Sequence, residues 1–373
     1  MTSSNKQKNK PPAPPSNPWL GIDIGGANLK LALCGSAGTP TWAASIPFPM
    51  WKQSEQLATT LATCIDDCPE FHAIALTMTG ELADCFATRA EGVAKILEQV
   101  TRLFPAPLVY VYGVDGQWRS PAQAARDPWI TAASNWHALA NWSRRFLQAN
   151  QHGVVVDIGS TTIDIVGISP KNVLSKSKTD SDRLKRHELI YTGVERSNLA
   201  GLVRSVPLHG KRCPVMNELF ATTRDAYVWM RYLDEAPDDC DTCDSRPMTR
   251  LHARFRLARL VGEDGSTITD TDIDAIAKTI HQKQSRLLRR GLEKVLTLSS
   301  PTTTESNNPV STLICSGHGE FLVREALKDG ALANRFGITG RCNLSEKLGP
   351  DFSRVAPALA VAQLAQETSE LQD

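Results

Sequence analysis

The sequence predicts a two-domain α/β protein with a cleft between its domains. Three observations lead to this fold class. The chain has 373 residues, enough for two or three domains of ordinary size. Short apolar segments alternate with amphipathic ones, as in a protein whose helices cover a mostly parallel sheet. A strand–turn–strand unit near residue 23 occurs again near residue 157, which indicates an internal repeat at the scale of a domain.

Composition excludes several classes of partner. The chain has 41 Lys+Arg against 40 Asp+Glu, so its formal net charge of +1 gives no electrostatic reason to expect nucleic acid. We also expect no membrane partner, because no apolar run approaches the roughly 18–20 residues that span a bilayer. The N-terminus lacks the apolar segment of a secretory signal, and the nine cysteines are few and odd in number. These features favour a cytoplasmic protein with reduced thiols and leave its oligomeric state open.

The first half of the chain contains the elements of one α/β domain. Residues 1–18 are rich in Ser, Asn, Lys and Pro, and we expect a disordered tail there. Residues 19–33 predict a buried strand, a tight glycine turn and a second strand. Apolar periodicity then predicts a strand at 41–47, a helix around 57–65, a strand at 73–78, a helix at 93–103, a strand at 108–112 and a helix at 136–146. We assign residues 19–151, together with 351–373, to domain I.

The second half begins with the repeated unit at residues 153–168. The elements expected after it are a polar connection at 171–188, a mixture of helix and acidic loop at 216–260, a long helix at 271–298, a strand at 313–316, a helix at 321–327 and an Ala-rich helix at 355–365. We assign residues 152–350 to domain II.

The two copies of the repeated unit carry residues suited to phosphate. Their turns read DIGGAN at residues 23–28 and DIGSTT at residues 157–162. Glycine lets an anion approach the backbone closely, and successive N–H groups in such turns form anion-binding sites. We therefore expect phosphate or nucleotide to bind Gly25, Gly26, Asn28, Lys30, Gly159, Ser160, Thr161 and Thr162.

A carboxylate precedes each turn. Asp23 and Asp157 would repel phosphate unless a cation lay between them, so we expect them to hold a hydrated Mg²⁺ through water and to be catalytic. The alternative is that both units are ordinary strand connections with glycine at the bend. Two copies, each opening one half of the chain, favour the phosphate site over that alternative.

A third motif points to a nucleotide. Residues 313–319, LICSGHG, combine a strand with a Gly-x-Gly turn that precedes a helix. Such a turn can admit a planar base beside the backbone. ATP is therefore a candidate cofactor, with Gly317 and Gly319 among the residues that would bind it.

Together these motifs resemble those of the actin/hexokinase/Hsp70 ATPase-like superfamily, which has a ribonuclease H-like fold in each of two domains. Within it, the chain is similar to the hydantoinase A/oxoprolinase-related family over about residues 19–365. The similarity rests on GIDIGGANLK (21–30), LTMTGELADCF (76–86), EGV (91–93), VVVDIGSTTIDI (154–165), YTGVERSNL (191–199), NELFATTRDAY (217–227), DTCDSRP (241–247) and RLARLVG (256–262). The chain departs from the family pattern at Asn28, where Thr is common, and at Ser245, where Gly is expected.

The most similar branch is tied to tetrahydromethanopterin-linked C1 transfer. The resemblance implies a transferase that joins a furanylmethyl diphosphate to the phenol of γ-glutamyltyramine and releases diphosphate, in methanofuran-type cofactor synthesis. A carboxylate would serve as base for the phenol, and Glu81, Asp84 and Asp225 are the candidates. The alternatives are an ATP-dependent small-molecule kinase or amide-ring hydrolase and, last, a non-catalytic nucleotide-binding actin-like protein.

Two further segments allow a structural and a functional interpretation. The string at 77–84 follows a strand end, where open α/β sheets bind ligands, but Thr79 could equally cap a helix. Cys240 and Cys243 lie in an acidic loop, which could be a lid. They could form half of a zinc site, although free thiols are the simpler interpretation because the chain has no second C-x-x-C pair.

Overall fold

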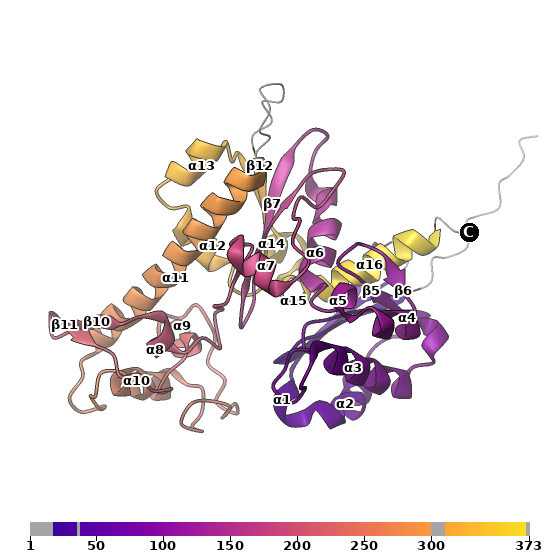
Figure 1. The fold of residues 1–373 in the computed structure, drawn as a ribbon. Coiled ribbons are helices and arrows are strands. Elements are labelled where there is room, and N and C mark those ends of the chain that lie inside the picture. The colour runs from indigo at the N-terminus through magenta and orange to yellow at the C-terminus, as the bar shows by residue number, and fades with distance from the viewer. Residues whose placement is uncertain (1–17, 36–37, 300–309, 371–373) are drawn as a thin grey trace, which may run out of the picture.

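A computed structural model describes residues 18–35, 38–299 and 310–370 (Figure 1). The predicted tail at residues 1–18 lies outside the described residues, apart from Pro18. Within the described ranges, no helix is both long enough and apolar enough to cross a membrane.

The first domain is built on a six-stranded sheet in the order β3-β2-β1-β4-β5-β6. Its strands are β1 (Trp19–Ile24), β2 (Asn28–Cys34), β3 (Pro40–Pro47), β4 (Ala73–Met78), β5 (Val109–Tyr112) and β6 (Trp118–Arg119). Every residue of β1 and β4 is buried, as expected of central strands covered on both faces.

The second domain is built on a five-stranded sheet in the order β13-β12-β7-β8-β9. Its strands are β7 (His152–Ile158), β8 (Ile163–Ile168), β9 (Leu189–Ile190), β12 (Val310–Ser316) and β13 (Gly340–Asn343). A separate hairpin joins β10 (Ser205–Leu208) to β11 (Lys211–Pro214).

The two sheets share one arrangement around their first strand. Strand β1 pairs antiparallel with β2 and parallel with β4, and β7 pairs antiparallel with β8 and parallel with β12. This shared topology confirms the internal repeat and the predicted fold class. The expectation of mostly parallel sheets is wrong, because both sheets are mixed. Only three residues separate β1 from β2, and so short a turn forces an antiparallel hairpin.

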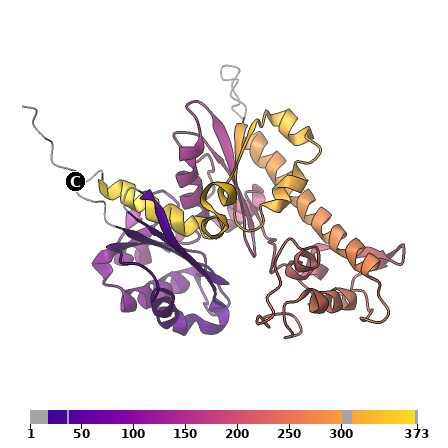
Figure 2. The same cartoon turned by 180° about the vertical axis from the view of Figure 1, so that it is seen from behind.

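Helices cover both sheets (Figures 1 and 2). Those before the second sheet, and the final helix, are α1 (Met50–Gln53), α2 (Leu57–Cys64), α3 (Arg89–Leu103), α4 (Pro121–Arg126), α5 (Pro128–Thr131), α6 (Asn135–Ser143) and α16 (Ala356–Glu370). The remaining helices are α7 (Asp180–Lys185), α8 (Leu199–Leu202), α9 (Thr223–Trp229), α10 (Arg250–Arg259), α11 (Asp270–Ser299), α12 (Phe321–Ala326), α13 (Ala331–Phe336), α14 (Leu344–Leu348) and α15 (Pro350–Arg354).

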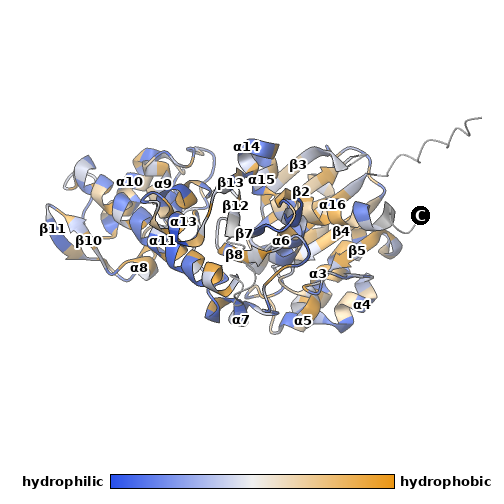
Figure 3. Cartoon of the chain, turned by 90° about the horizontal axis from the view of Figure 1, so that it is seen from above, coloured by the Kyte–Doolittle hydropathy of each residue, from blue (hydrophilic) through white to orange (hydrophobic). Residues whose placement is uncertain are grey.

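Helices α6 and α16 join the two domains. Helix α16 packs on β1, β2 and β4, whereas α6 packs on β7 and β8, and the two helices pack on each other. A Cβ atom at Gly21 of β1 would lie 1.9 Å from the carbonyl oxygen of Ala358, so only glycine allows α16 to pack this closely. In Figure 3, β2, β4 and α16 are coloured mostly as hydrophobic, whereas α7 is coloured mostly as hydrophilic.

The long helix α11 leads away from the second sheet to a small helical unit (Figure 1). Its C-terminal half contributes Leu288 and Leu292 to the core of the second sheet. Its N-terminal half contributes Ile273 and Ile276 to a separate core that also contains side chains of α8, α9 and α10. The helical unit is therefore attached to the second domain through one continuous helix.

Candidate active site

The repeated turns have the same local geometry. In the first turn (residues 25–28), the N–H of Gly25 donates to the carbonyl oxygen of Asn28 at 3.0 Å. In the second turn (residues 159–162), the N–H of Gly159 donates to the carbonyl oxygen of Thr162, also at 3.0 Å. Each turn closes a hairpin and is therefore held rigidly at the end of a buried strand.

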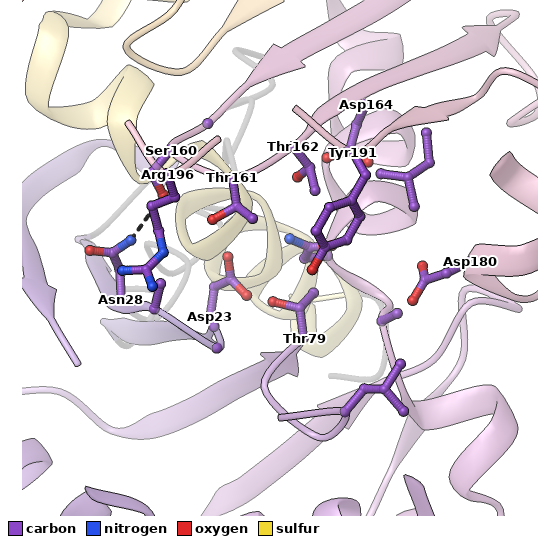
Figure 4. A pocket seen from close by; sticks show the side chains of 18 of the residues that line it. Asp23, Asn28, Thr79, Ser160, Thr161, Thr162, Asp164, Asp180, Tyr191 and Arg196 are labelled. Atoms are coloured by element: carbon purple, nitrogen blue, oxygen red, sulfur yellow. Dashed lines mark hydrogen bonds between the residues drawn. The ribbon is translucent and has the colours of Figure 1, made fainter. Parts of the chain in front are cut away.

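The two turns line one cavity of about 420 Å³ between the domains, a volume in the range of small-molecule sites. Figure 4 shows this cavity. The predicted site residues that line it are Asp23, Gly25, Gly26, Asn28, Lys30, Asp84, Asp157, Gly159, Ser160, Thr161 and Thr162.

Asp23 lies at the base of the first turn. Lys30 is its cross-strand neighbour, because β1 and β2 pair Asp23 with Lys30. Burial raises the pKa of Asp23 to about 6, although Lys30 lowers it in part. The Oδ1 atom of Asp23 is buried and has no hydrogen-bond partner, so one carboxylate oxygen is available to a ligand.

Asp157 has the matching position in the second domain. Its Oδ1 accepts a hydrogen bond of 2.6 Å from the hydroxyl of Ser316. Burial raises the pKa of Asp157, and the nearby cation of Lys30 opposes this rise, as it does for Asp23. The cross-strand neighbour of Asp157 is Asp164, which forms an ion pair with Arg183.

The donor set fits magnesium bound largely through water. Among the described residues, no three His, Cys, Asp or Glu side chains form a metal-binding cluster. Magnesium commonly uses one or two carboxylates, with water and substrate phosphates as its other ligands. The unpartnered Oδ1 of Asp23, and Asp157 across the cleft, match that pattern.

Contacts cross the cleft on the side of Asn28. The amide of Asn28 donates to the hydroxyl of Ser160 at 3.1 Å, which joins the two turns directly (Figure 4). The guanidinium of Arg196 lies 4.5 Å from the ring centre of Trp51, so a cation from the second domain stacks on a ring from the first. Both of these residues line the cavity.

Sequence reasoning did not single out several lining residues, namely Trp51, Asp164, Asp180, Arg183, Leu189, Tyr191 and Arg196. Tyr191 and Arg196 lie within the family string at 191–199, but nothing in that string marks either side chain as facing a ligand. Both residues lie well beyond the second turn in the sequence, and only the fold brings them to the cavity that this turn lines.

The segment after β4 faces the cavity, and it does not begin a helix. The N–H groups of Thr79 and Gly80 donate to the carbonyl oxygen of Ile24, and Thr79 lines the cavity. The next helix, α3, begins at Arg89, and its N-cap is Thr88. The interpretation of Thr79 as a helix cap is therefore wrong.

Two of the three candidate bases lie away from the cavity. Glu81 is 1% exposed and forms an ion pair with Arg89, and burial raises its pKa to about 7. Asp225 is also 1% exposed, and its Oδ1 accepts a hydrogen bond of 2.6 Å from Arg256 in the helical unit. Neither lines the cavity. Asp225 is held by Arg256, whereas the Oε2 atom of Glu81 is buried without a hydrogen-bond partner. Asp84 is exposed and does line it.

The acidic loop is held by arginine side chains. Asp244 accepts hydrogen bonds from Arg256 and Arg259, and Asp239 accepts one from Arg224. These ion pairs fasten the loop to α9 and α10, and within the described ranges the structure shows no group of three or more His, Cys, Asp or Glu side chains that could hold a metal there. Cys240 and Cys243 are free thiols.

Gly317 and Gly319 pack against the back of the second turn. A Cβ atom at Gly317 would lie 2.3 Å from the carbonyl oxygen of Ile158, and one at Gly319 would lie 2.2 Å from the Ile158 side chain. Neither glycine lines the cavity. Close packing on Ile158 of β7 accounts for both glycines, and their part in binding a nucleotide stays a prediction.

A family model described as hydantoinase/oxoprolinase matches residues 72–368. The chain belongs to this family. One curated relative in it, from Methanocaldococcus jannaschii, is 32% identical over 348 residues, which cover 93% of this chain and 97% of that protein. It is named (4-{4-[2-(gamma-L-glutamylamino)ethyl]phenoxymethyl}furan-2-yl)methanamine synthase. A protein of the same name from Methanococcus vannielii is 27% identical over 211 residues, which cover 57% of this chain and 89% of that protein.

Solved structures align over nearly the whole of this hydantoinase/oxoprolinase-family chain. A ROK family glucokinase from Streptomyces griseus, in complex with glucose and AMPPNP, has a TM-score of 0.44 and 15% identity and covers 94% of this chain and 99% of its own. An activator of 2-hydroxyisocaproyl-CoA dehydratase from Clostridium difficile, with bound ADPNP, has a TM-score of 0.42 and 11% identity and covers 95% and 96%.

Proposed function

We propose that the protein is a transferase that joins a furanylmethyl diphosphate to the phenol of γ-glutamyltyramine and releases diphosphate. The proposal is supported by the relative from Methanocaldococcus jannaschii, whose name describes this phenoxymethyl-furan product and which aligns with this chain over 97% of its length. The reaction belongs to the synthesis of methanofuran-type C1 carriers. The substrates are therefore small molecules, in keeping with the volume of the cavity.

The reaction exchanges one carbon–oxygen bond for another. The bond between the furanylmethyl carbon and the diphosphate oxygen breaks, and its electron pair leaves with the diphosphate. The phenol oxygen forms the new bond to that carbon, and the phenol proton passes to a base. The site must therefore stabilise the charge that develops on diphosphate and accept one proton.

The opposed turns carry the proposal, because they suit a diphosphate. Residues of both turns, among them Thr161 and Thr162, line the cavity together with Lys30. Arg196 adds a second cation near Asn28 and Ser160 (Figure 4). Asp23 and Asp157 would hold Mg²⁺, which when bound would neutralise charge on the leaving group.

Asp84 is the base that we propose. It lines the cavity next to Leu82 and forms no ion pair with any residue that the structure describes, so its carboxylate is free to accept a proton. By contrast, Asp164 and Asp180 also line the cavity but are held by Arg183.

The deciding experiment is to supply pure protein with MgCl₂, an aminomethyl-furanylmethyl diphosphate and γ-glutamyltyramine, and to follow products by mass spectrometry. We expect equal amounts of the phenyl ether and free diphosphate, with no requirement for ATP. Formation of ADP from ATP with either small molecule, without the ether, would instead support an ATP-dependent kinase or hydrolase. Binding of ATP without any turnover would support a nucleotide-binding protein that is not an enzyme.

A further inference from the structure

One large side chain of the cavity has no role in this scheme. Tyr191 is 72% exposed, the highest value among the large apolar side chains of the described residues, although it lines the cavity. Leu82, which is 59% exposed, lines the same cavity from the other domain. Exposed apolar side chains that share a cavity mark a place where a ligand covers them.

The backbone that follows Tyr191 is fastened to the second turn. The N–H of Val194 donates to the carbonyl oxygen of Gly159, and those of Glu195 and Arg196 donate to that of Ser160, all at 3.0 Å. A Cβ atom at Gly193 would lie 2.4 Å from the Ser160 carbonyl, so only glycine permits this approach. The position of Tyr191 is thus fixed relative to the groups that would bind diphosphate.

Tyr191 and Arg196 lie on opposite sides of the cavity. In Figure 4, Arg196 lies beside Asn28 and Ser160, whereas Tyr191 lies on the other side and its hydroxyl points toward Thr79. Arg196, stacked on Trp51, therefore lies on one side of the cavity, and Tyr191 lies on the other, where Figure 4 also shows Asp164 and Asp180.

We propose that Tyr191 and Leu82 bind the aromatic ring of the phenol acceptor. This proposal rests on the proposed function. The phenol must approach the furanylmethyl carbon from the side away from the departing diphosphate, and Tyr191 is the ring on the side away from Arg196. The acceptor also carries a long charged γ-glutamyl tail. Because Tyr191 and Leu82 are exposed, a ring bound against them would leave this tail in solvent.

The test compares Tyr191→Ala, Tyr191→Phe and a matched control, Leu219→Ala, which truncates an exposed apolar side chain outside the cavity. Removal of the ring in Tyr191→Ala should raise the KM for γ-glutamyltyramine about 3–10-fold, the range of one aromatic contact. The KM for the furan diphosphate should stay within about twofold, because the turns and Lys30 remain. Tyr191→Phe keeps the ring and should stay close to wild type, as should Leu219→Ala. An unchanged KM for the phenol in Tyr191→Ala, or an equal rise for both substrates, would overturn the proposal.

A binding measurement separates this proposal from the proposed function. Calorimetry would measure the affinity of γ-glutamyltyramine for the protein in the presence of MgCl₂ and inorganic diphosphate. If wild type forms no ether but binds the phenol, and Tyr191→Ala weakens that binding, the proposed function fails and the aromatic subsite stands. If wild type forms the ether while Tyr191→Ala binds the phenol normally, the subsite fails and the function stands. A wild-type protein that binds no phenol at all contradicts the subsite.

Discussion

Replacement of Asp23 by Asn should make the protein more stable and inactive. Asp23 is 2% exposed, and its Oδ1 has no hydrogen-bond partner, so the charged form is poorly solvated in the folded protein. Asn has nearly the same shape and removes only the charge. The variant therefore separates the cost of the buried charge in the folded state from its use in catalysis.

The expected gain in stability follows from the pKa of Asp23. Burial raises this pKa from 3.8 to about 6, so the folded state binds the proton more tightly than the unfolded state does. One pKa unit corresponds to about 1.4 kcal/mol, so ionised Asp23 lowers the free energy of unfolding by about 3 kcal/mol. This loss is absent below about pH 4, grows as the pH rises toward 6, and is complete above it. The Asp23→Asn variant avoids the loss.

Urea unfolding at pH 4 and at pH 8, in EDTA, measures this effect. We expect Asp23→Asn to exceed wild type by about 3 kcal/mol at pH 8 and to match it near pH 4. Added Mg²⁺ should then stabilise wild type and leave the variant unchanged. Asp84→Asn is the control, because Asp84 lines the same cavity but is exposed, and its effect should stay within about 0.5 kcal/mol. A variant that is less stable than wild type at pH 8, or a difference that persists at pH 4, would refute the reasoning.

Three further predictions concern other residues. Asp157→Asn should lower kcat about 10²–10³-fold. The double variant with Asp23→Asn should be little worse than either single variant, because both carboxylates would serve one ion. Near-wild-type turnover in Asp157→Asn would contradict a phosphate-binding cleft. Asp225→Asn should destabilise the protein by about 3 kcal/mol while leaving KM unchanged, because it leaves Arg256, which is fully buried, with one carboxylate partner fewer; urea unfolding and steady-state kinetics decide this. Ser245→Gly should stabilise the protein by about 1 kcal/mol, since Ser245 has a φ of 55° in the left-handed region; a lower unfolding midpoint would contradict it.

Local sequence patterns predicted the elements well, because they depend on contacts within each element. The predicted helix at 271–298 is α11, which spans Asp270–Ser299, and the strand predicted at 73–78 is β4. The family pattern likewise predicted the backbone at residue 245. It has glycine at this position, and Ser245 adopts a positive φ there. Patterns of this kind record backbone geometry and burial, which neighbouring residues impose.

The composition of the site was harder to predict, because it depends on which elements the fold brings together. Asp84 follows strand β4, and Asp225 lies in the first turn of helix α9; both belong to family strings. Asp84 lines the cavity, whereas Asp225 is hydrogen-bonded to Arg256 in the helical unit. Similarly, Gly317 fits a nucleotide motif by sequence, but its contact with Ile158 shows that packing requires it. A motif identifies the residue type that a position needs and leaves open whether a ligand or a neighbouring strand imposes that need.

The two turns line one cavity, but their hairpins differ in the residue paired with the aspartate. At the position paired with the aspartate across each hairpin, the first copy has Lys30 opposite Asp23 and the second has Asp164 opposite Asp157. Two copies with aspartate at that place would put four carboxylates around one cavity and repel phosphate. Lys30 instead lowers the pKa of both Asp23 and Asp157, and Arg183 pairs with Asp164. One half of the repeat thus supplies a cation that offsets negative charge at both buried carboxylates.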